Sequence, residues 1–180
     1  ENLLMGNPNA TEEEIQAAFR PNTKLVFGET LSNPNVRILD IERIAKIAHD
    51  HGVPLIVDNT FPTPVNCRPF EFGADIVTHS TTKYMDGQGV QVGGVIVDSG
   101  NFDWAQYHER FACLTEPDAS YHGLRYTEAF GKLAYSTNVD SNNSFPMPEH
   151  GEGYAIKVDS IWEYFWVFDY EQLRAQLDTV

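Results

Sequence analysis

The chain has 180 residues, 42% of them hydrophobic and 12% aromatic, so it can fold around a sizeable core. Its formal net charge is -14, and an acidic surface repels phosphate backbones and anionic lipids. Nucleic acid and membrane surfaces are therefore disfavoured as partners. No apolar run approaches the roughly 20 residues that a membrane-spanning helix needs.

The cysteines and histidines give no sign of a metal site. Cys67 and Cys113 are far apart in the sequence, which favours two free thiols in a reducing compartment, the cytoplasm, over one disulfide. The histidines lack metal-ligand spacing, and His49 and His51 are interpreted as surface residues of a helix. The first ten residues have no signal-type apolar core and no initiator Met, so we expect a piece of a longer protein.

Two helices are expected in the first third of the chain. Thr11 with Glu14 three residues later forms a capping-box pattern that starts the first helix, which runs to about Phe19. The second helix starts at the cap Asp40, carries an apolar stripe, and ends before Gly52, which suits the left-handed C' position.

Four short apolar runs are expected to be strands. They cover residues 24–30, 54–58, 74–80 and 92–97. Strands that alternate with helices indicate an α/β fold with a mostly parallel sheet flanked by helices. After Tyr135 the composition changes: residues 136–153 are rich in Ser, Asn, Pro and Gly and predict a linker or long loop, whereas 171–177 predict a short helical turn.

Polar side chains follow the carboxyl ends of three successive predicted strands. In open α/β sheets, ligands bind outside these ends. The sequence therefore predicts a site at this edge, made of an acid, an amide, hydroxyls and one amine: Glu29, Asn33, Asp58, Thr60, Ser80, Thr82 and Lys83.

A lysine that is partly desolvated at the end of a buried strand can act as a neutral amine and attack a carbonyl. The aldehyde of pyridoxal phosphate is the commonest such partner, and it gives a Schiff base. Ser80 and Thr82 can donate to the phosphate, Asp58 can keep the pyridine nitrogen protonated, and Asn33 can donate to the ring oxygen. Each residue alone can also be explained as a cap or a solvated loop residue. Their convergence at three strand ends favours the joint, functional interpretation.

Two other kinds of site are disfavoured by local spacing. The stretch "GQGVQVGG" lacks the spacing of a nucleotide-binding P-loop and leads into a strand. No serine lies in the G-x-S-x-G context of a serine hydrolase.

Five segments carry a family resemblance: "ETLSNPN", "PLIVDNTFPTP", "FGADIVTHSTTKYMDGQG", "GGVIVDSGNFDW" and "YHGLRYTEAFG". They resemble the Cys/Met-metabolism family of pyridoxal-phosphate enzymes, and within it the O-acetylhomoserine sulfhydrylase branch. The resemblance runs from about residue 11 to about residue 135. It implies a partial large domain of the aspartate-aminotransferase type (fold type I) over 1–135 and a divergent tail over 136–180.

The resemblance also implies roles for the predicted site residues. Lys83 would be the catalytic, Schiff-base lysine, and Asp58 would pair with the pyridinium nitrogen. Ser80 and Thr82 would hold the phosphate. Asn33 would contact the ring oxygen, Thr60 would lie near the ring, and Glu29 would line the substrate pocket.

The implied reaction converts O-acetyl-L-homoserine and sulfide to L-homocysteine and acetate, in methionine and cysteine biosynthesis. Members of the family form homo-oligomers, dimers or tetramers, and are longer than this chain. Gln88 stands where His is usual in the family, and Arg125 where Ser is usual. Two alternatives stay open: a related lyase or synthase of the methionine γ-lyase or cystathionine γ-synthase type, and an inactive remnant that keeps the fold core as a binding or structural piece.

Overall fold

A computed structural model describes residues 10–143, 154–157 and 164–169 of the chain. It divides into two compact units, Glu1–Gly89 and Val90–Val180, and each is described by itself. The helical turn expected at 171–177 lies outside the described residues. Among the described residues, no helix has the length and apolar character needed to cross a membrane.

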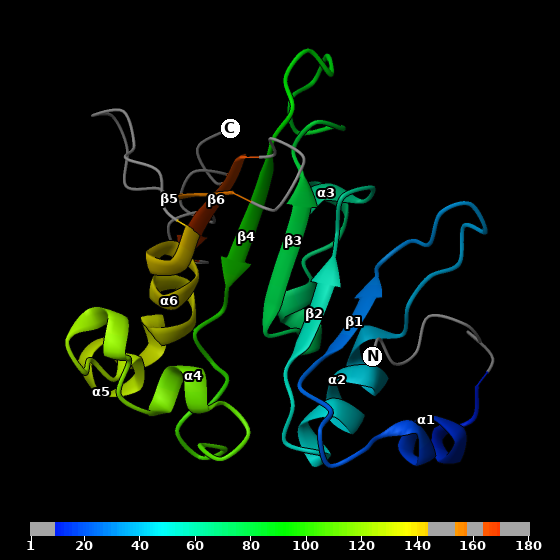
Figure 1. Ribbon diagram of the computed structural model, residues 1–180. Helices are drawn as coiled ribbons and strands as arrows, with labels where there is room; N and C mark the ends of the chain where they lie inside the picture. Colours follow the sequence, from blue (N-terminus) through cyan, green and yellow to red (C-terminus); the bar gives the residue numbers. More distant parts are fainter. Residues whose placement is uncertain (1–9, 144–153, 158–163, 170–180) are drawn as a thin grey trace. The chain divides into compact units, whose positions relative to one another are not determined.

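The first unit contains a parallel sheet of three strands. These are β1 (Val26–Glu29), β2 (Leu55–Asp58) and β3 (Ile76–Ser80), in the spatial order β1-β2-β3. The strands match three of the expected ones, which confirms the α/β prediction. Because all three run in the same direction, their carboxyl ends meet at one edge, where the arrowheads lie in Figure 1.

Two helices of the first unit begin as the sequence predicts. Helix α1 (Glu12–Ala18) has a complete capping box between Thr11 and Glu14. Helix α2 (Ile41–Asp50) is capped by Asp40, whose side chain accepts a hydrogen bond from the backbone of Arg43. The chain then turns at Gly52 with a φ of 66°, the left-handed conformation expected there.

Helix α2 covers one face of the sheet. Alternate strand residues form a buried cluster with the apolar stripe of the helix: Val26, Leu55, Val57, Val77, Ile41, Ala45 and Ala48. Because successive side chains of a strand point to opposite faces, Glu29, Asp58 and Ser80 lie on the other face. The sheet thus separates these three polar residues from the apolar core.

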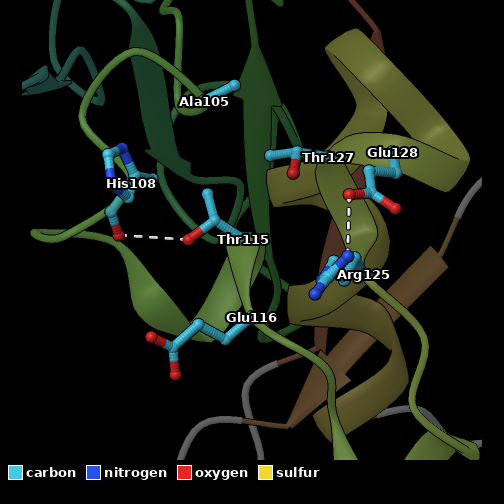
Figure 2. A pocket seen from close by; sticks show the side chains of 7 residues that line it. All are labelled: Ala105, His108, Thr115, Glu116, Arg125, Thr127 and Glu128. Atoms are coloured by element: carbon cyan, nitrogen blue, oxygen red, sulfur yellow. Dashed lines mark hydrogen bonds and ion pairs between the residues drawn. The ribbon is translucent and has the colours of Figure 1, made fainter.

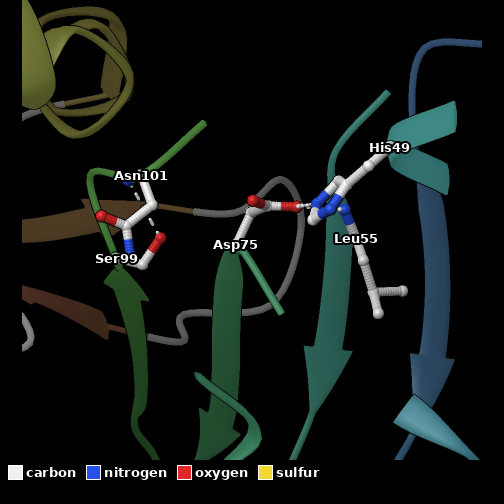
Figure 3. A network of polar contacts seen from close by, with 5 residues as sticks. All are labelled: His49, Leu55, Asp75, Ser99 and Asn101. Carbon is white, nitrogen blue, oxygen red and sulfur yellow. Dashed lines mark hydrogen bonds and ion pairs between the residues drawn. The ribbon is translucent and has the colours of Figure 1, made fainter. Parts of the chain in front are cut away.

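A buried carboxylate joins α2 to the sheet in the first unit, as Figure 3 shows. Asp75, whose side chain is 5% exposed, accepts hydrogen bonds from the Leu55 backbone and the His49 ring, both at 2.8 Å. This hydrogen bond raises the pKa of His49. His49 is a surface residue, as expected, with its side chain 41% exposed, and its ring also ties the C-terminal end of α2 to Asp75. Its neighbour His51 stacks on Phe19, with ring centroids 4.0 Å apart.

Short helices connect β2 to β3. They are α3 (Thr63–Asn66) and the 3-10 helix η1 (Pro69–Phe72). The side chain of Asn59 lies beneath this connection, fully buried, and donates hydrogen bonds to the carbonyls of Thr63 and Cys67. The connection is therefore tied to the end of β2.

The second unit combines three strands with a helical segment. Strand β4 (Gly94–Asp98) pairs in parallel with β6 (Tyr164–Asp169), and β5 (Tyr154–Lys157) pairs antiparallel with β6. Between β4 and β5 lie α4 (Ala112–Thr115), η2 (Ala119–Tyr121), α5 (Tyr126–Phe130), η3 (Gly131–Leu133) and α6 (Ala134–Asn143). Directly after β4, the backbone N–H of Asn101 donates to the hydroxyl of Ser99 (Figure 3).

Helix α6 contradicts part of the expected linker. Residues 136–143 are helical, although Ser, Asn and Asp are weak helix formers. The physical reason is packing at the helix start: Ala134 is fully buried, and Tyr135 stacks on Trp104 with ring centroids 5.4 Å apart. Burial of this first turn offsets the low helix propensity of the residues that follow. Strands β5 and β6 have no counterpart among the predicted elements.

Candidate functional site

The end of β2 supplies a carboxylate and a hydroxyl. Asp58 is the last residue of the strand, and Thr60 lies two residues further along, in the loop. The Oδ1 atom of Asp58 accepts a hydrogen bond of 2.8 Å from the Thr60 backbone. Thr60 is 8% exposed. The turn fixes the carboxylate of Asp58 at the carboxyl edge of the sheet.

The end of β3 is tied to the same loop. The Oγ1 atom of Thr60 accepts a hydrogen bond of 2.8 Å from the backbone N–H of Ser80, the last residue of β3. A turn follows, in which the backbone N–H of Lys83 donates to the carbonyl of Ser80 at 3.2 Å. Thr82 lies within this turn. The structure therefore brings the hydroxyl and lysine segment beside Asp58, as the sequence predicts.

The side chain of Lys83 is exposed in this structure. The sequence argument expected a partly desolvated amine at the end of a buried strand. That expectation is wrong for this chain by itself, because Lys83 lies three residues beyond β3, in an exposed turn. A desolvated Lys83 requires a bound group or further polypeptide over the turn.

The end of β1 supplies the remaining two residues. Glu29 ends the strand and lies in register with Asp58 on β2. Its Oε2 atom accepts a hydrogen bond of 3.1 Å from the backbone N–H of Asn33. Asn33 lies in the exposed loop that follows β1. All seven predicted residues thus lie at or just after the carboxyl ends of three neighbouring strands.

One titratable group close to this edge was missed by the sequence reasoning. His79 lies between Thr78 and Ser80 on β3 and is 2% exposed. Burial lowers the pKa of His79 to about 4, although the negative charge of Asp58 acts in the opposite direction. The ring is therefore neutral at pH 7. Strand alternation with Val77 was the signal that could have placed it on the buried face.

Several polar groups at this edge retain hydrogen-bonding capacity. Within the described part of the chain, no partner is present for the Oδ2 atom of Asp58, the hydroxyl of Ser80, the carboxamide of Asn33 or the amine of Lys83. One carboxylate oxygen, one hydroxyl, one amide and one ammonium suit a ligand that carries a phosphate, a basic ring nitrogen and a carbonyl carbon. The donor set fits pyridoxal phosphate.

A separate pocket of about 300 Å³ lies in the second unit. Figure 2 shows the side chains that line it: Ala105, His108, Thr115, Glu116, Arg125, Thr127 and Glu128. The guanidinium of Arg125 pairs with the carboxylate of Glu128 at 3.1 Å. None of the predicted site residues lines this pocket, so it does not form part of the predicted site.

The described residues contain no cluster of three or more His, Cys, Asp or Glu side chains suited to a metal ion. Cys67 and Cys113 are free thiols, and burial raises the pKa of Cys67.

Comparison with known sequences identifies the family. Residues 6–137 match the sequence profile of the Cys/Met metabolism PLP-dependent enzymes. The chain belongs to this family. The resemblance inferred from the strand-end motifs is thereby confirmed, together with pyridoxal phosphate as the family's cofactor.

Two curated relatives illustrate the match. The chain is 48% identical to a homocysteine/cysteine synthase of Saccharomyces cerevisiae over 128 residues, which is 71% of this chain and 29% of that protein. It is also 48% identical to an O-acetyl-L-homoserine sulfhydrylase of Corynebacterium glutamicum over 130 residues, 71% of this chain and 30% of that protein. The chain thus spans about 30% of the length of these relatives.

A solved structure supports the fold. The chain resembles an O-acetylhomoserine (thiol)-lyase of Campylobacter jejuni that carries N'-pyridoxyl-lysine-5'-monophosphate, with a TM-score of 0.65 and 35% identity. The match covers 71% of this chain and 32% of that structure. The expected α/β fold of the pyridoxal-phosphate large domain is confirmed.

Proposed function

We propose that this chain is part of a sulfhydrylase that converts O-acetyl-L-homoserine and sulfide to L-homocysteine and acetate. The observation that carries the proposal is the joining of Asp58, Thr60 and Ser80 by two hydrogen bonds of 2.8 Å. It gathers a carboxylate, hydroxyls and the lysine turn at one sheet edge in a chain of this family. The similarity to relatives named for this reaction supports the substrate class.

Six of the seven residues at the edge have a proposed task toward the cofactor. Lys83 would hold the cofactor covalently through Nζ. Asp58 would keep the ring nitrogen protonated, and Asn33 would donate to the ring oxygen. Ser80 and Thr82 would donate to the phosphate, and Thr60 would fix the loop beside the ring. When bound, pyridoxal phosphate supplies an electron sink for negative charge that develops on the substrate carbons.

The overall replacement balances without an oxidant or reductant. The bond between Cγ and the ester oxygen breaks, and acetate leaves with the electron pair. Hydrosulfide supplies the electron pair of the new bond between Cγ and sulfur. Once released from the cofactor, the Nζ amine of Lys83 would take the proton from the substrate Cα and return it later, as a general base and acid.

The wider setting of the chain is also part of the proposal. Residues 1–135 would belong to the large cofactor-binding domain, and 136–180 to a divergent tail. The full-length protein would be a cytoplasmic homo-oligomer, as inferred from the family resemblance and the free thiols.

Product analysis separates this proposal from its nearest alternatives. The full-length protein to which the chain belongs is mixed with pyridoxal phosphate, O-acetyl-L-homoserine and sulfide, and the products are measured. Homocysteine and acetate in equal amounts are expected. Ammonia with 2-oxobutanoate would indicate a lyase. Binding of the cofactor without formation of any product would indicate an inactive remnant.

A further inference from the structure

The carboxylate of Glu29 is engaged by the loop that follows its own strand. Its Oε2 atom accepts the hydrogen bond of 3.1 Å from the backbone of Asn33. A carboxylate that accepts an N–H bond is a strong acceptor, because the bond is charge-assisted. The family resemblance assigned Glu29 to the substrate pocket, but this contact gives the side chain a different task.

The loop after β1 is closed at its base by hydrogen bonds of its own. Leu31 and Ile38 form an antiparallel bridge. Ser32 makes three bonds across the loop: its N–H donates to Arg37 at 2.9 Å, its carbonyl accepts from Val36 at 2.9 Å, and its hydroxyl accepts from Arg37 at 3.0 Å. Asn33 comes next to Ser32, so these bonds hold the chain on both sides of it.

The loop base is attached to the strand that carries Asp58. The backbone N–H of Thr30 donates to the carbonyl of Asp58 at 2.9 Å, and the carbonyl of Thr30 accepts from Leu39 at 3.0 Å. Glu29 and Asp58 are register partners on neighbouring parallel strands. Glu29 therefore links the backbone of Asn33 to the strand pair that carries Asp58.

A strained residue lies at the far side of this loop. Val36 has a φ of 52°, which is unfavourable for a β-branched residue, and it is 70% exposed. Such a conformation persists only where surrounding bonds determine it, and here the bonds of Ser32 do so. The same bonds restrict the movement of Asn33, which lies between Ser32 and Val36.

We propose that Glu29 is a positioning residue, whose carboxylate holds the backbone of Asn33 so that the Asn33 carboxamide meets the cofactor beside Asp58. The inference rests on the proposed function for the contact between Asn33 and the cofactor. In the described part of the chain the Asn33 carboxamide has no hydrogen-bond partner, so it is available for this contact. Glu29 acts through Asn33 and does not itself touch the substrate.

The first test needs no cofactor. Amide hydrogen exchange at Asn33 is measured in the 180-residue chain and in Glu29→Ala, Glu29→Gln and Glu71→Ala. Glu71 is a matched control, because it is an exposed carboxylate paired with Arg68 at 3.0 Å. Exchange at Asn33 should accelerate by roughly tenfold in Glu29→Ala, less in Glu29→Gln, whose amide oxygen still accepts, and not at all in Glu71→Ala.

The second test measures the affinity for pyridoxal phosphate by absorption titration in Glu29→Ala, Asn33→Ala and the double variant. If Glu29 acts through Asn33, each single change should weaken binding by roughly tenfold, and the double change by about the same factor. Two independent contacts would instead weaken binding by roughly a hundredfold in the double variant.

Each outcome bears on one of the two proposals. Unchanged exchange at Asn33 or unchanged cofactor affinity in Glu29→Ala, or an additive double variant, would overturn the positioning role of Glu29. Unchanged cofactor affinity in Asn33→Ala would overturn the contact between Asn33 and the cofactor that the proposed function assigns. If the unmodified chain forms no covalent adduct between Lys83 and pyridoxal phosphate, the proposed function would be overturned instead. The exchange result would still show whether Glu29 holds the loop.

Discussion

The hydroxyl of Thr60 accepts a hydrogen bond of 2.8 Å from the backbone N–H of Ser80, and this bond joins the loop after β2 to the end of β3. Thr60 is 8% exposed, so the bond is sheltered from water. Two segments that are twenty residues apart in the sequence are thereby fixed side by side. The lysine turn begins at one of them, and the carboxylate of Asp58 precedes the other.

Replacing Thr60 by valine tests this bond. Valine keeps the shape but removes the acceptor, so the N–H of Ser80 loses its partner. The free energy of unfolding should fall by about 1–3 kcal/mol. Urea denaturation measures the loss, and Thr60→Ser should restore most of it. Equal stability of the valine variant would mean that the bond contributes nothing.

The charge of Asp58 is tested by Asp58→Asn. The amide oxygen can still accept from the backbone of Thr60, so the turn should survive and the circular dichroism spectrum should not change. The affinity for pyridoxal phosphate should fall by at least tenfold, because a hydrogen bond to a charged group is lost. An affinity equal to that of the unmodified chain would assign Asp58 to turn formation alone.

The burial of His79 predicts a pH dependence of stability. The pKa is lowered from 6.5 to about 4 in the fold, so between these values the unfolded chain binds more protons than the folded one. Stability should therefore fall as the pH decreases from 6.5 toward 4, by an amount of the order of 3 kcal/mol. Denaturation at several pH values should show a flatter profile in His79→Gln than in the unmodified chain.

The pair of His49 and Asp75 changes stability with pH in the opposite direction, because the pKa of His49 is raised. Its contribution is complete below pH 6.5 and is lost as the pH rises through the folded pKa. Identical profiles in His79→Gln and the unmodified chain would contradict the burial of an ionisable ring at this position.

Trp104→Ala should strongly destabilise the start of α6, because Trp104 stacks on Tyr135. The indole is 5% exposed and packs against Phe102, Phe111 and Tyr135, with ring centroids 4.7, 5.0 and 5.4 Å away. Removal should cost about 3–5 kcal/mol of the free energy of unfolding. Thermal unfolding followed by circular dichroism measures this, and a loss below about 1 kcal/mol would show that α6 does not depend on the cluster.

The sequence predicted the parts of the fold that depend on local patterns. The cap residues Thr11 and Asp40 started helices, and the strand ends at Glu29, Asp58 and Ser80 gathered the candidate site, because parallel strands end at one edge. Helix α6 was missed because its stability comes from the packing of Ala134 and Tyr135, which local propensity does not register.

The identity of the candidate site residues could be predicted from the sequence better than their exposure and their contacts. The exposure of Lys83 depends on what covers its turn, and the contact between Glu29 and Asn33 depends on the fold of a loop. The pairing of His49 with Asp75 joins residues 26 positions apart, which no periodicity indicates. Residue types identified the chemistry, whereas tertiary contacts decided which side chains perform it.

The role of Lys83 as the lysine that binds the cofactor can be measured by mapping the covalent attachment. The chain is incubated with pyridoxal phosphate, reduced with borohydride, digested and analysed by mass spectrometry. We expect one pyridoxyl adduct, on the peptide that contains Lys83, and its loss in Lys83→Ala without a change in fold. An adduct on Lys24, Lys46, Lys132 or Lys157 with Lys83 unmodified would contradict the assignment of Lys83.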